Sequence, residues 1–209
     1  MTIYKNMKKI NTLIKITIIS MILVSCATAP PKNMNDACSI IHENPDWYYD
    51  MVDSYGRWGV PMNVQMAIIR QESAFRSDAK PPMQYFLGFI PTGRASSAYG
   101  YAQSLDGTWD HYKKETKQSF VSRSNFADAT DFIGWYLNNV HNKTGINKTD
   151  AFNMYLAYHE GVYGYMRGSY KGNDFLIKYA RKTQDHARTY ASQLQRCSIP
   201  RKPLLSYIF

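Results

Sequence analysis

Apolar side chains recur at three- and four-residue steps along most of this sequence, which is the spacing of one face of an α-helix. The clearest example lies between Asn125 and Val140, where the repeating residues are Ala129, Phe132, Ile133, Tyr136, Leu137 and Val140. The same spacing predicts further helices over Asp46–Trp58, Thr108–Thr116, Thr149–His159 and Phe175–Leu194. No segment alternates apolar and polar residues for long enough to require a large sheet, and we find no internal repeat. The sequence therefore predicts a mostly α-helical fold.

One further predicted helix, which opens at Val60-Pro61, ends on a carboxylate, Glu72. Proline suits the first position of a helix because its missing N–H would have no partner there. Apolar residues occupy most sides of this helix, so we expect Glu72 to lose part of its hydration. That loss disfavours the charged form and raises the pKa, which makes Glu72 a candidate general acid near neutral pH. The alternative is an exposed glutamate near a helix end, which is the commoner situation.

The segment between this helix and the next, residues 77–100, is rich in Pro, Gly and Ser and has an apolar run, Phe86–Ile90, in its middle. Ordinary connections inside a compact domain are much shorter, and long ones are usually functional. We therefore expect a functional loop here, with room for a short hairpin.

Residues 1–25 have the features of an export signal. Four lysines, Lys5, Lys8, Lys9 and Lys15, precede the apolar run Ile16–Val24, which is well short of the roughly 20 residues of a membrane-spanning helix. The run ends in Leu23-Val24-Ser25-Cys26, which resembles the lipobox of bacterial lipoproteins. The resemblance implies lipidation of Cys26, membrane attachment through that lipid and, with Ala27 next, the outer membrane facing the periplasm. The alternatives are an ordinary secretory signal, or a short anchor, with an incidental cysteine.

The rest of the chain is mildly basic and suits one domain. The whole sequence carries a formal charge of +9, and because residues 1–25 contribute four lysines and no acid, +5 remains. Such a surface suits an anionic polymer, but the chain has no zinc-finger spacing, phosphate-binding loop, dinucleotide fingerprint or RNA-binding signature. We expect no nucleic-acid partner. We interpret residues 26–37 as a lipid-anchored tether and residues 38–209 as the domain.

Two cysteines, Cys38 and Cys197, lie near the two ends of that domain. In an oxidising compartment an isolated pair of this kind most simply forms one disulfide, and two buried thiols are the alternative. Their spacing fits neither a zinc site nor a redox CxxC motif, and no metal site is expected.

Three short motifs stand out against this background: Arg70–Phe75, Ala98–Gln103 and Tyr155–Gly161. In this order they resemble the signature motifs of the soluble lytic transglycosylases (SLT domains), lysozyme-like enzymes that cleave peptidoglycan. Those motifs are a Glu-Ser pair on a helix, a Gly-x-x-Gln turn followed by Thr-Trp (here Thr108-Trp109), and an Ala-Tyr-Asn-Ala-Gly stretch. The resemblance covers roughly Asp46 to Tyr190 and implies a single lysozyme-like (goose-type) domain, with a long loop or small hairpin after the catalytic helix.

The resemblance also implies a reaction that needs no cofactor. Glu72 would protonate the glycosidic oxygen between MurNAc and GlcNAc and then take the proton of the sugar's own 6-hydroxyl, which closes a 1,6-anhydro ring. Ser73 and Gln103 would bond the sugar, Tyr158 would bond Glu72 or the substrate, and tyrosines would line the groove. The full set of implied substrate-binding residues is Ser73, Tyr99, Gly100, Tyr101, Gln103, Tyr158, Glu160 and Tyr165.

The third motif departs from the family pattern, because His159 and Glu160 stand where the family has Asn and Ala. As a second carboxylate, Glu160 could activate water and give a hydrolytic muramidase. It could equally bond backbone N–H groups of the turn Gly161–Gly164, and we favour that structural role. His159 is also interpreted as structural. A lipoprotein that binds peptidoglycan without cutting it is a further alternative, although binding alone does not need a desolvated acid at Glu72.

Overall fold

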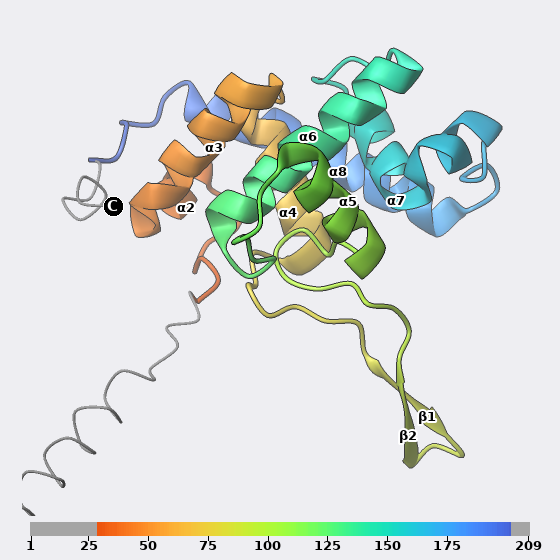
Figure 1. Ribbon diagram of the computed structural model, residues 1–209. Helices are drawn as coiled ribbons and strands as arrows, with labels where there is room; N and C mark the ends of the chain where they lie inside the picture. The colour runs from red at the N-terminus through yellow and green to blue at the C-terminus, as the bar shows by residue number, and fades with distance from the viewer. Residues whose placement is uncertain (1–28, 202–209) are drawn as a thin grey trace, which may run out of the picture.

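The structure, a computed structural model, describes residues 29–201, and in that range the chain forms seven α-helices and one two-stranded hairpin (Figure 1). The helices are α2 (Ala37–Glu43), α3 (Pro45–Trp58), α4 (Met62–Ser73), α5 (Asp106–Thr116), α6 (Phe126–Thr144), α7 (Ala151–Arg167) and α8 (Asp174–Leu194). The strands are β1 (Met83–Phe86) and β2 (Ile90–Arg94). The predicted mostly helical fold with a small hairpin after the Glu72 helix is confirmed. The predicted export signal and Cys26 lie outside the described residues.

Local signals in the sequence explain where several helices begin and end. Gly59 adopts a left-handed conformation that ends α3, and the side chain of Asn125 accepts a hydrogen bond from the N–H of Asp128 at the start of α6. The cap of α7 is Asp150, one residue after the predicted start at Thr149, and its side chain accepts a hydrogen bond from the N–H of Asn153. The short helix α2 is an element that the sequence did not predict.

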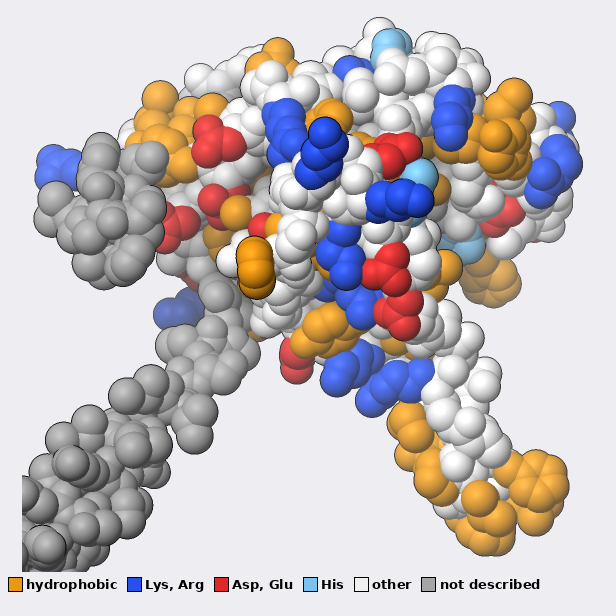
Figure 2. Space-filling view, viewed as in Figure 1, with side chains coloured by type: hydrophobic (Ala, Val, Ile, Leu, Met, Phe, Trp, Pro, Cys, Tyr) orange, Lys and Arg blue, Asp and Glu red, His pale blue; other side chains and the backbone are white. Residues whose placement is uncertain are grey.

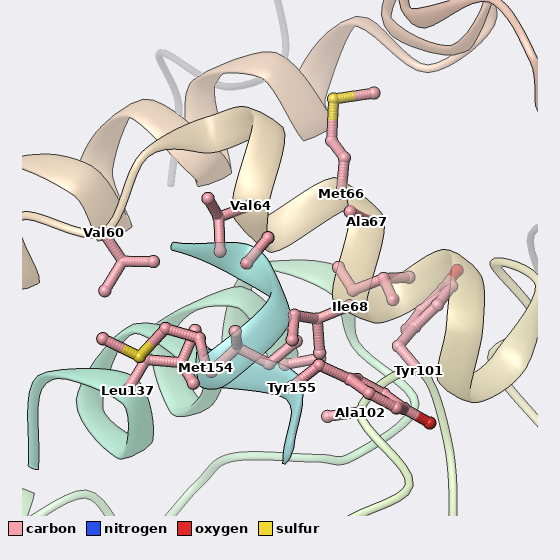
Figure 3. Close-up of a cluster of buried hydrophobic side chains, with 14 of the residues drawn as sticks. Val60, Val64, Met66, Ala67, Ile68, Tyr101, Ala102, Leu137, Met154 and Tyr155 are labelled. Carbon is pink, nitrogen blue, oxygen red and sulfur yellow. The ribbon is translucent and has the colours of Figure 1, made fainter. Parts of the chain in front are cut away.

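The helix α4 is the centre of the bundle and contacts α3, α6, α7 and α8. Its Val64 and Ile68 are fully buried, and Figure 3 shows them in one cluster with Leu137 of α6 and Met154 of α7. Full burial of an aliphatic side chain contributes about 1.5–3 kcal/mol. A helix held on so many sides keeps the residues at its end, including Glu72, in a fixed place.

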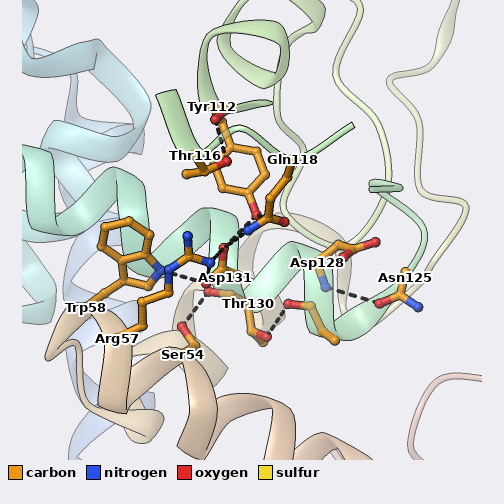
Figure 4. A network of polar contacts seen from close by, with 11 residues as sticks. Ser54, Arg57, Trp58, Tyr112, Thr116, Gln118, Asn125, Asp128, Thr130 and Asp131 are labelled. Carbon is orange, nitrogen blue, oxygen red and sulfur yellow. Dashed lines mark hydrogen bonds and ion pairs between the residues drawn. The ribbon is translucent and has the colours of Figure 1, made fainter. Parts of the chain in front are cut away.

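A polar cluster around Asp131 joins α3, α5 and α6 (Figure 4). The Asp131 carboxylate of α6 accepts hydrogen bonds from Trp58 Nε1 at 2.7 Å and from the Tyr112 hydroxyl at 2.6 Å, and Arg57 forms an ion pair with it at 3.1 Å. Burial and the neighbouring Asp131 raise the pKa of Tyr112, so its hydroxyl remains a donor. The cluster thereby fixes α5 against α6.

The two ends of the domain meet. Cys38 of α2 and Cys197, just after α8, form a disulfide with a Cα–Cα distance of 5.4 Å, which confirms the predicted pairing. The part of the expected tether that the structure describes is docked on this side, since Pro31 is buried and the carbonyl of Met34 accepts hydrogen bonds from Arg70 and Tyr190. Extended tether structure is therefore not seen in residues 31–37.

The strands β1 and β2 pair in antiparallel register and project from the helical body as a separate arm (Figure 1). Their register shifts between Gln84 and Tyr85, as in a β-bulge. The arm occupies the long connection between α4 and α5, as predicted. None of the helices within residues 29–201 is long and apolar enough to cross a lipid bilayer.

Candidate active site

A cleft of about 450 Å³ opens beside the end of α4. Its walls come from α4, from the segment that follows the arm, and from α5, α6 and α7. The lining residues are Glu72, Ala98, Gln103, Ser104, Leu105, Thr108, Phe132, Tyr136, Tyr158, His159, Glu160 and Gly161. The cleft thus combines two carboxyl groups, several uncharged polar groups and aromatic rings.

Glu72 lies in the last turn of α4 and faces this cleft. The chain turns sharply after it, because Ala74 and Phe75 both have positive φ, and the buried Phe75 ring stacks on Trp47 with centroids 5.8 Å apart. Burial raises the pKa of Glu72 from its ordinary 4.5 to about 7, and a hydrogen bond from Tyr155 opposes part of that rise. At neutral pH the carboxyl group is therefore protonated in a large fraction of molecules.

The tyrosine that bonds Glu72 is Tyr155 rather than the expected Tyr158. The two lie three residues apart on α7, and burial together with the nearby Glu72 raises the pKa of each, so both keep their protons. The Tyr158 hydroxyl donates instead to the carbonyl of Ala102 at 2.5 Å. Tyr158 still lines the cleft. Of the two roles expected for Tyr158, the bond to Glu72 is made by Tyr155 instead, and contact with the substrate stays a prediction.

The second motif forms a tight turn whose backbone needs glycine. Gly100 has φ of 75°, and a Cβ there would lie 2.0 Å from the carbonyl oxygen of Arg123. Gln103, also at positive φ, donates from Nε2 to the carbonyls of Ala79 and Gly100, both at 2.9 Å. The structure therefore gives Gly100 a backbone role and uses the Gln103 amide N–H₂ to hold the turn, while Gln103 itself lines the cleft.

Two residues expected to bind substrate lie away from the cleft. The Ser73 hydroxyl is buried and donates to the carbonyl of Ile69 in its own helix at 3.1 Å. Tyr101 is only 1 % exposed and packs edge-on against Trp47 and Phe126. Both expectations need correction, because the Ser73 hydroxyl is satisfied within its own helix and the Tyr101 ring packs in the core.

Tyr99 and Tyr165 are also outside this cleft. Tyr99 lines a neighbouring hollow, with the cationic groups of Lys80 and Arg123 within 5.1 and 5.4 Å of its ring centroid. The Tyr165 hydroxyl donates to Asn153 Oδ1, and its ring stacks on Tyr170. Their direct contact with a sugar at the Glu72 cleft is not supported by these positions.

His159 and Glu160 both line the cleft, where a break in α7 exposes them. Gly161 has φ of 72° and ψ of 159°, a conformation that is not helical and that glycine adopts at low cost. His159 Nδ1 lies 3.2 Å from Glu160 Oε1. That contact, rather than the expected bonds to backbone N–H groups of residues 161–164, is the polar contact of the Glu160 side chain.

Several cleft residues were missed from the sequence. Phe132 and Tyr136 of α6 belong to an apolar stripe that indicates core packing, and nothing in the pattern separates those at the cleft from those beneath it. Tyr155, which bonds Glu72 without being among the lining residues, could have been found from its three-residue spacing to Tyr158. Within residues 29–201, no three His, Cys, Asp or Glu side chains are grouped to hold a metal ion.

Comparison with protein families adds one match. The family model described as "Transglycosylase SLT domain" matches residues 14–197, which is most of the chain. No curated protein matches the sequence.

Proposed function

Because the chain belongs to the transglycosylase SLT domain family, whose substrate is peptidoglycan, we propose that it is a lytic transglycosylase that cleaves the MurNAc–GlcNAc bond and leaves a 1,6-anhydro end. The observation that carries this proposal is the buried carboxyl group of Glu72 at the cleft, where burial raises its pKa to about 7. A carboxyl group in that state can give a proton near neutral pH and take one back within a single turnover.

In the first step the protonated Glu72 donates to the glycosidic oxygen, and the bond from that oxygen to C1 of MurNAc breaks. Positive charge then develops on the sugar ring, and Glu72 is left as a carboxylate. The hydroxyl of Tyr155, which hydrogen-bonds Glu72, stabilises this charged form in a place where burial disfavours it.

In the second step the 6-hydroxyl of the same MurNAc attacks C1, and the Glu72 carboxylate takes its proton. This restores the acid, so one carboxyl group suffices for the whole reaction. Because the nucleophile belongs to the bound sugar, its effective concentration is high and no water has to be positioned. Gln103, Tyr158 and Tyr136 at the walls are the residues available to hold the glycan in the required orientation.

A second candidate, hydrolysis, is favoured by one observation: Glu160 lies in the same cleft as Glu72. A carboxylate there could act as the base for a water molecule, which would give a muramidase with reducing ends. We favour the transglycosylase, because Glu160 is paired with His159 at 3.2 Å and the family assignment is to transglycosylases.

Product analysis tests these alternatives. Purified peptidoglycan is digested, and the released fragments are measured by mass spectrometry, since an anhydro end is lighter than a reducing end by one water. We expect anhydro ends from the wild type and from Glu160→Gln, and no release from Glu72→Gln. Reducing ends as the main wild-type product would establish the muramidase. Binding without any release would establish the non-cutting alternative.

We also propose that the protein is a lipoprotein attached through Cys26 to the outer membrane and facing the periplasm. The support is the sequence Leu23-Val24-Ser25-Cys26 after a short apolar run. Changing Cys26 to Ser should move the protein from the membrane fraction to the soluble fraction. A variant that stays in the membrane with the mass of the wild type would count against lipidation.

A further inference from the structure

The end of the β1–β2 arm is a cluster of exposed apolar side chains, which we call the apolar tip (residues 85–90). Phe86, Leu87 and Phe89 are 60 %, 70 % and 71 % exposed, and Tyr85 and Ile90 beside them are also exposed. Figure 2 shows this cluster as the far end of the arm, well separated from the helical body. Large apolar side chains gathered in this way usually mark a surface that contacts something apolar.

The arm does not stabilise itself by burying these residues. Its two strands pair only with each other, and all four residues of β1 are exposed. A lone two-stranded hairpin is at best marginally stable in water. The turn is nevertheless tightly closed: Leu87 and Gly88 take positive φ, and the N–H of Phe89 donates to the carbonyl of Phe86. The turn therefore brings Phe86 and Phe89 together at the tip.

The charges along the arm have one sign. No Asp or Glu occurs between Asp78 and Asp106, whereas Lys80 and Arg94 lie at the base of the arm, exposed to solvent. Arg94, at the end of β2, donates to the carbonyl of Pro81, which lies just before β1. This hydrogen bond holds the guanidinium group at the base of the arm. Figure 2 shows Lys and Arg side chains where the arm joins the body and apolar ones at its end. The apolar end of the arm would suit the acyl region of a bilayer, and the cations at its base would suit anionic headgroups.

The geometry of the arm suits the same surface. Strands of four and five residues reach roughly 15 Å at about 3.3 Å per residue. Interfacial elements bury their apolar side by about 5–10 Å, which is less than the length of the arm. In Figure 1 the first described residues of the chain and the arm both lie on the lower side of the body. One flat surface below the body could therefore meet both.

We propose that the apolar tip inserts into the interfacial region of a lipid bilayer, with Lys80 and Arg94 on the anionic headgroups. The arm thereby acts as a second membrane contact, independent of any lipid on Cys26. Ala98, four residues beyond β2, lines the Glu72 cleft. Insertion would consequently hold the cleft at a set height above the bilayer. The inference does not depend on the reaction that Glu72 performs.

A single-cysteine label tests the proposal in the full-length chain. In a Cys26→Ser background, with Cys38 and Cys197 bonded to each other, Phe89→Cys provides the one free thiol. It is labelled with a polarity-sensitive fluorophore, and the protein is mixed with phosphatidylethanolamine–phosphatidylglycerol vesicles that carry a nitroxide near the top of the acyl chain. We expect a blue shift of the emission and severalfold stronger quenching than in vesicles without nitroxide.

The matched control is Tyr55→Cys in the same background, a half-exposed site on α3, which lies away from the arm in Figure 1. Its label should show neither change, even where residues 1–25 bring the protein to the vesicle. Adding Lys80→Glu and Arg94→Glu to the Phe89→Cys protein should weaken the quenching in anionic vesicles, and raising the salt concentration should do the same.

Equal responses at the two labelled sites would overturn the proposal, because proximity to the vesicle alone would then explain the signal. A tip label that ignores lipid but shifts when a periplasmic protein fraction is added would also overturn it, in favour of a protein partner. Unchanged thermal unfolding of the labelled variants confirms that the helical body is intact, as expected for exposed positions.

Discussion

At the scale of single residues, the burial of Glu72 changes both the protonation of its carboxyl group and the stability of the folded protein. Burial raises its pKa from 4.5 to about 7, so the acid is protonated when substrate binds near neutral pH. The same burial makes the ionised form unfavourable in the folded protein but not in the unfolded chain. The folded state therefore holds a proton between these two pH values that the unfolded state has released, and stability falls as pH rises from about 4.5 to about 7.

This linkage gives the first prediction. Replacing Glu72 by Gln, which cannot ionise, should raise the free energy of unfolding at pH 8 by up to about 3 kcal/mol, and the gain should vanish at pH 4. The variant should have no activity, because an amide cannot donate the proton. Wild-type activity should fall as pH rises through about 7. Urea unfolding at the two pH values measures the difference.

Asp53→Asn on the exposed face of α3 is a suitable control for this measurement, because it also exchanges a carboxyl group for an amide. It should change stability little at either pH. A Glu72→Gln variant no more stable than the wild type at pH 8 would contradict the raised pKa.

The raised pKa of Glu72 could be predicted from the sequence because its cause is local: an acid ends an apolar helix. The roles of its neighbours depend on which way side chains face in three dimensions. Tyr155 and Tyr158 lie on one side of α7, and only the packing shows that Tyr155 bonds Glu72 while Tyr158 bonds the Ala102 carbonyl. The inward position of Tyr101 was missed for the same reason.

At the scale of elements, the break in α7 places His159 and Glu160 at the cleft. These are the two residues that differ from the family pattern. The predicted end of this helix at His159 is close to the break at Gly161, after which the helix resumes to Arg167. Periodicity predicted the long helices because each buries a stripe of apolar residues. It could not separate the cleft wall from the core on α6, where both are apolar.

The second prediction concerns this break. Gly161→Ala should destabilise the protein by about 1–3 kcal/mol, since a residue with a Cβ is strained at that φ and ψ. The nearest atom to such a Cβ is the Tyr136 hydroxyl at 4.0 Å, so crowding is not the cause. We also expect activity to fall, because relief of the strain would move Glu160 and Tyr158 at the cleft.

The matched control for that change is Gly56→Ala, inside α3 with no atom within 4 Å of the added Cβ. Alanine should stabilise that helix by up to about 1 kcal/mol without altering activity. Thermal unfolding and turnover are measured for both variants. Equal effects of the two substitutions would show that the Gly161 conformation is not required.

At the scale of the whole molecule, a disulfide joins the two ends of the domain, whereas the β1–β2 arm projects from the helical body. The disulfide and the docked segment 31–36 hold the start of the domain against α8, as shown by the 2.8 Å hydrogen bond from the N–H of Ala37 to Gln193 Oε1. The sequence predicted the disulfide from the number and position of cysteines alone. It did not predict the docking of the segment before α2, because the carbonyl of Met34 accepts hydrogen bonds from Arg70 and Tyr190, which lie 36 and 156 positions away in the sequence.

The last prediction separates the disulfide from these docking contacts. The two cysteines are 159 residues apart, and closing so long a loop removes much of the conformational freedom of the unfolded chain. The double variant Cys38→Ala with Cys197→Ala should therefore lower the free energy of unfolding by about 2–5 kcal/mol. Activity at low temperature should persist, because neither cysteine lines the cleft. Urea unfolding with and without reductant provides an internal control: reduced wild type should match the variant, and the variant should ignore the reductant. If reductant leaves the unfolding midpoint of the wild type unchanged as well, hydrogen bonds such as those of Met34 and Gln193 already hold the ends together without the covalent link.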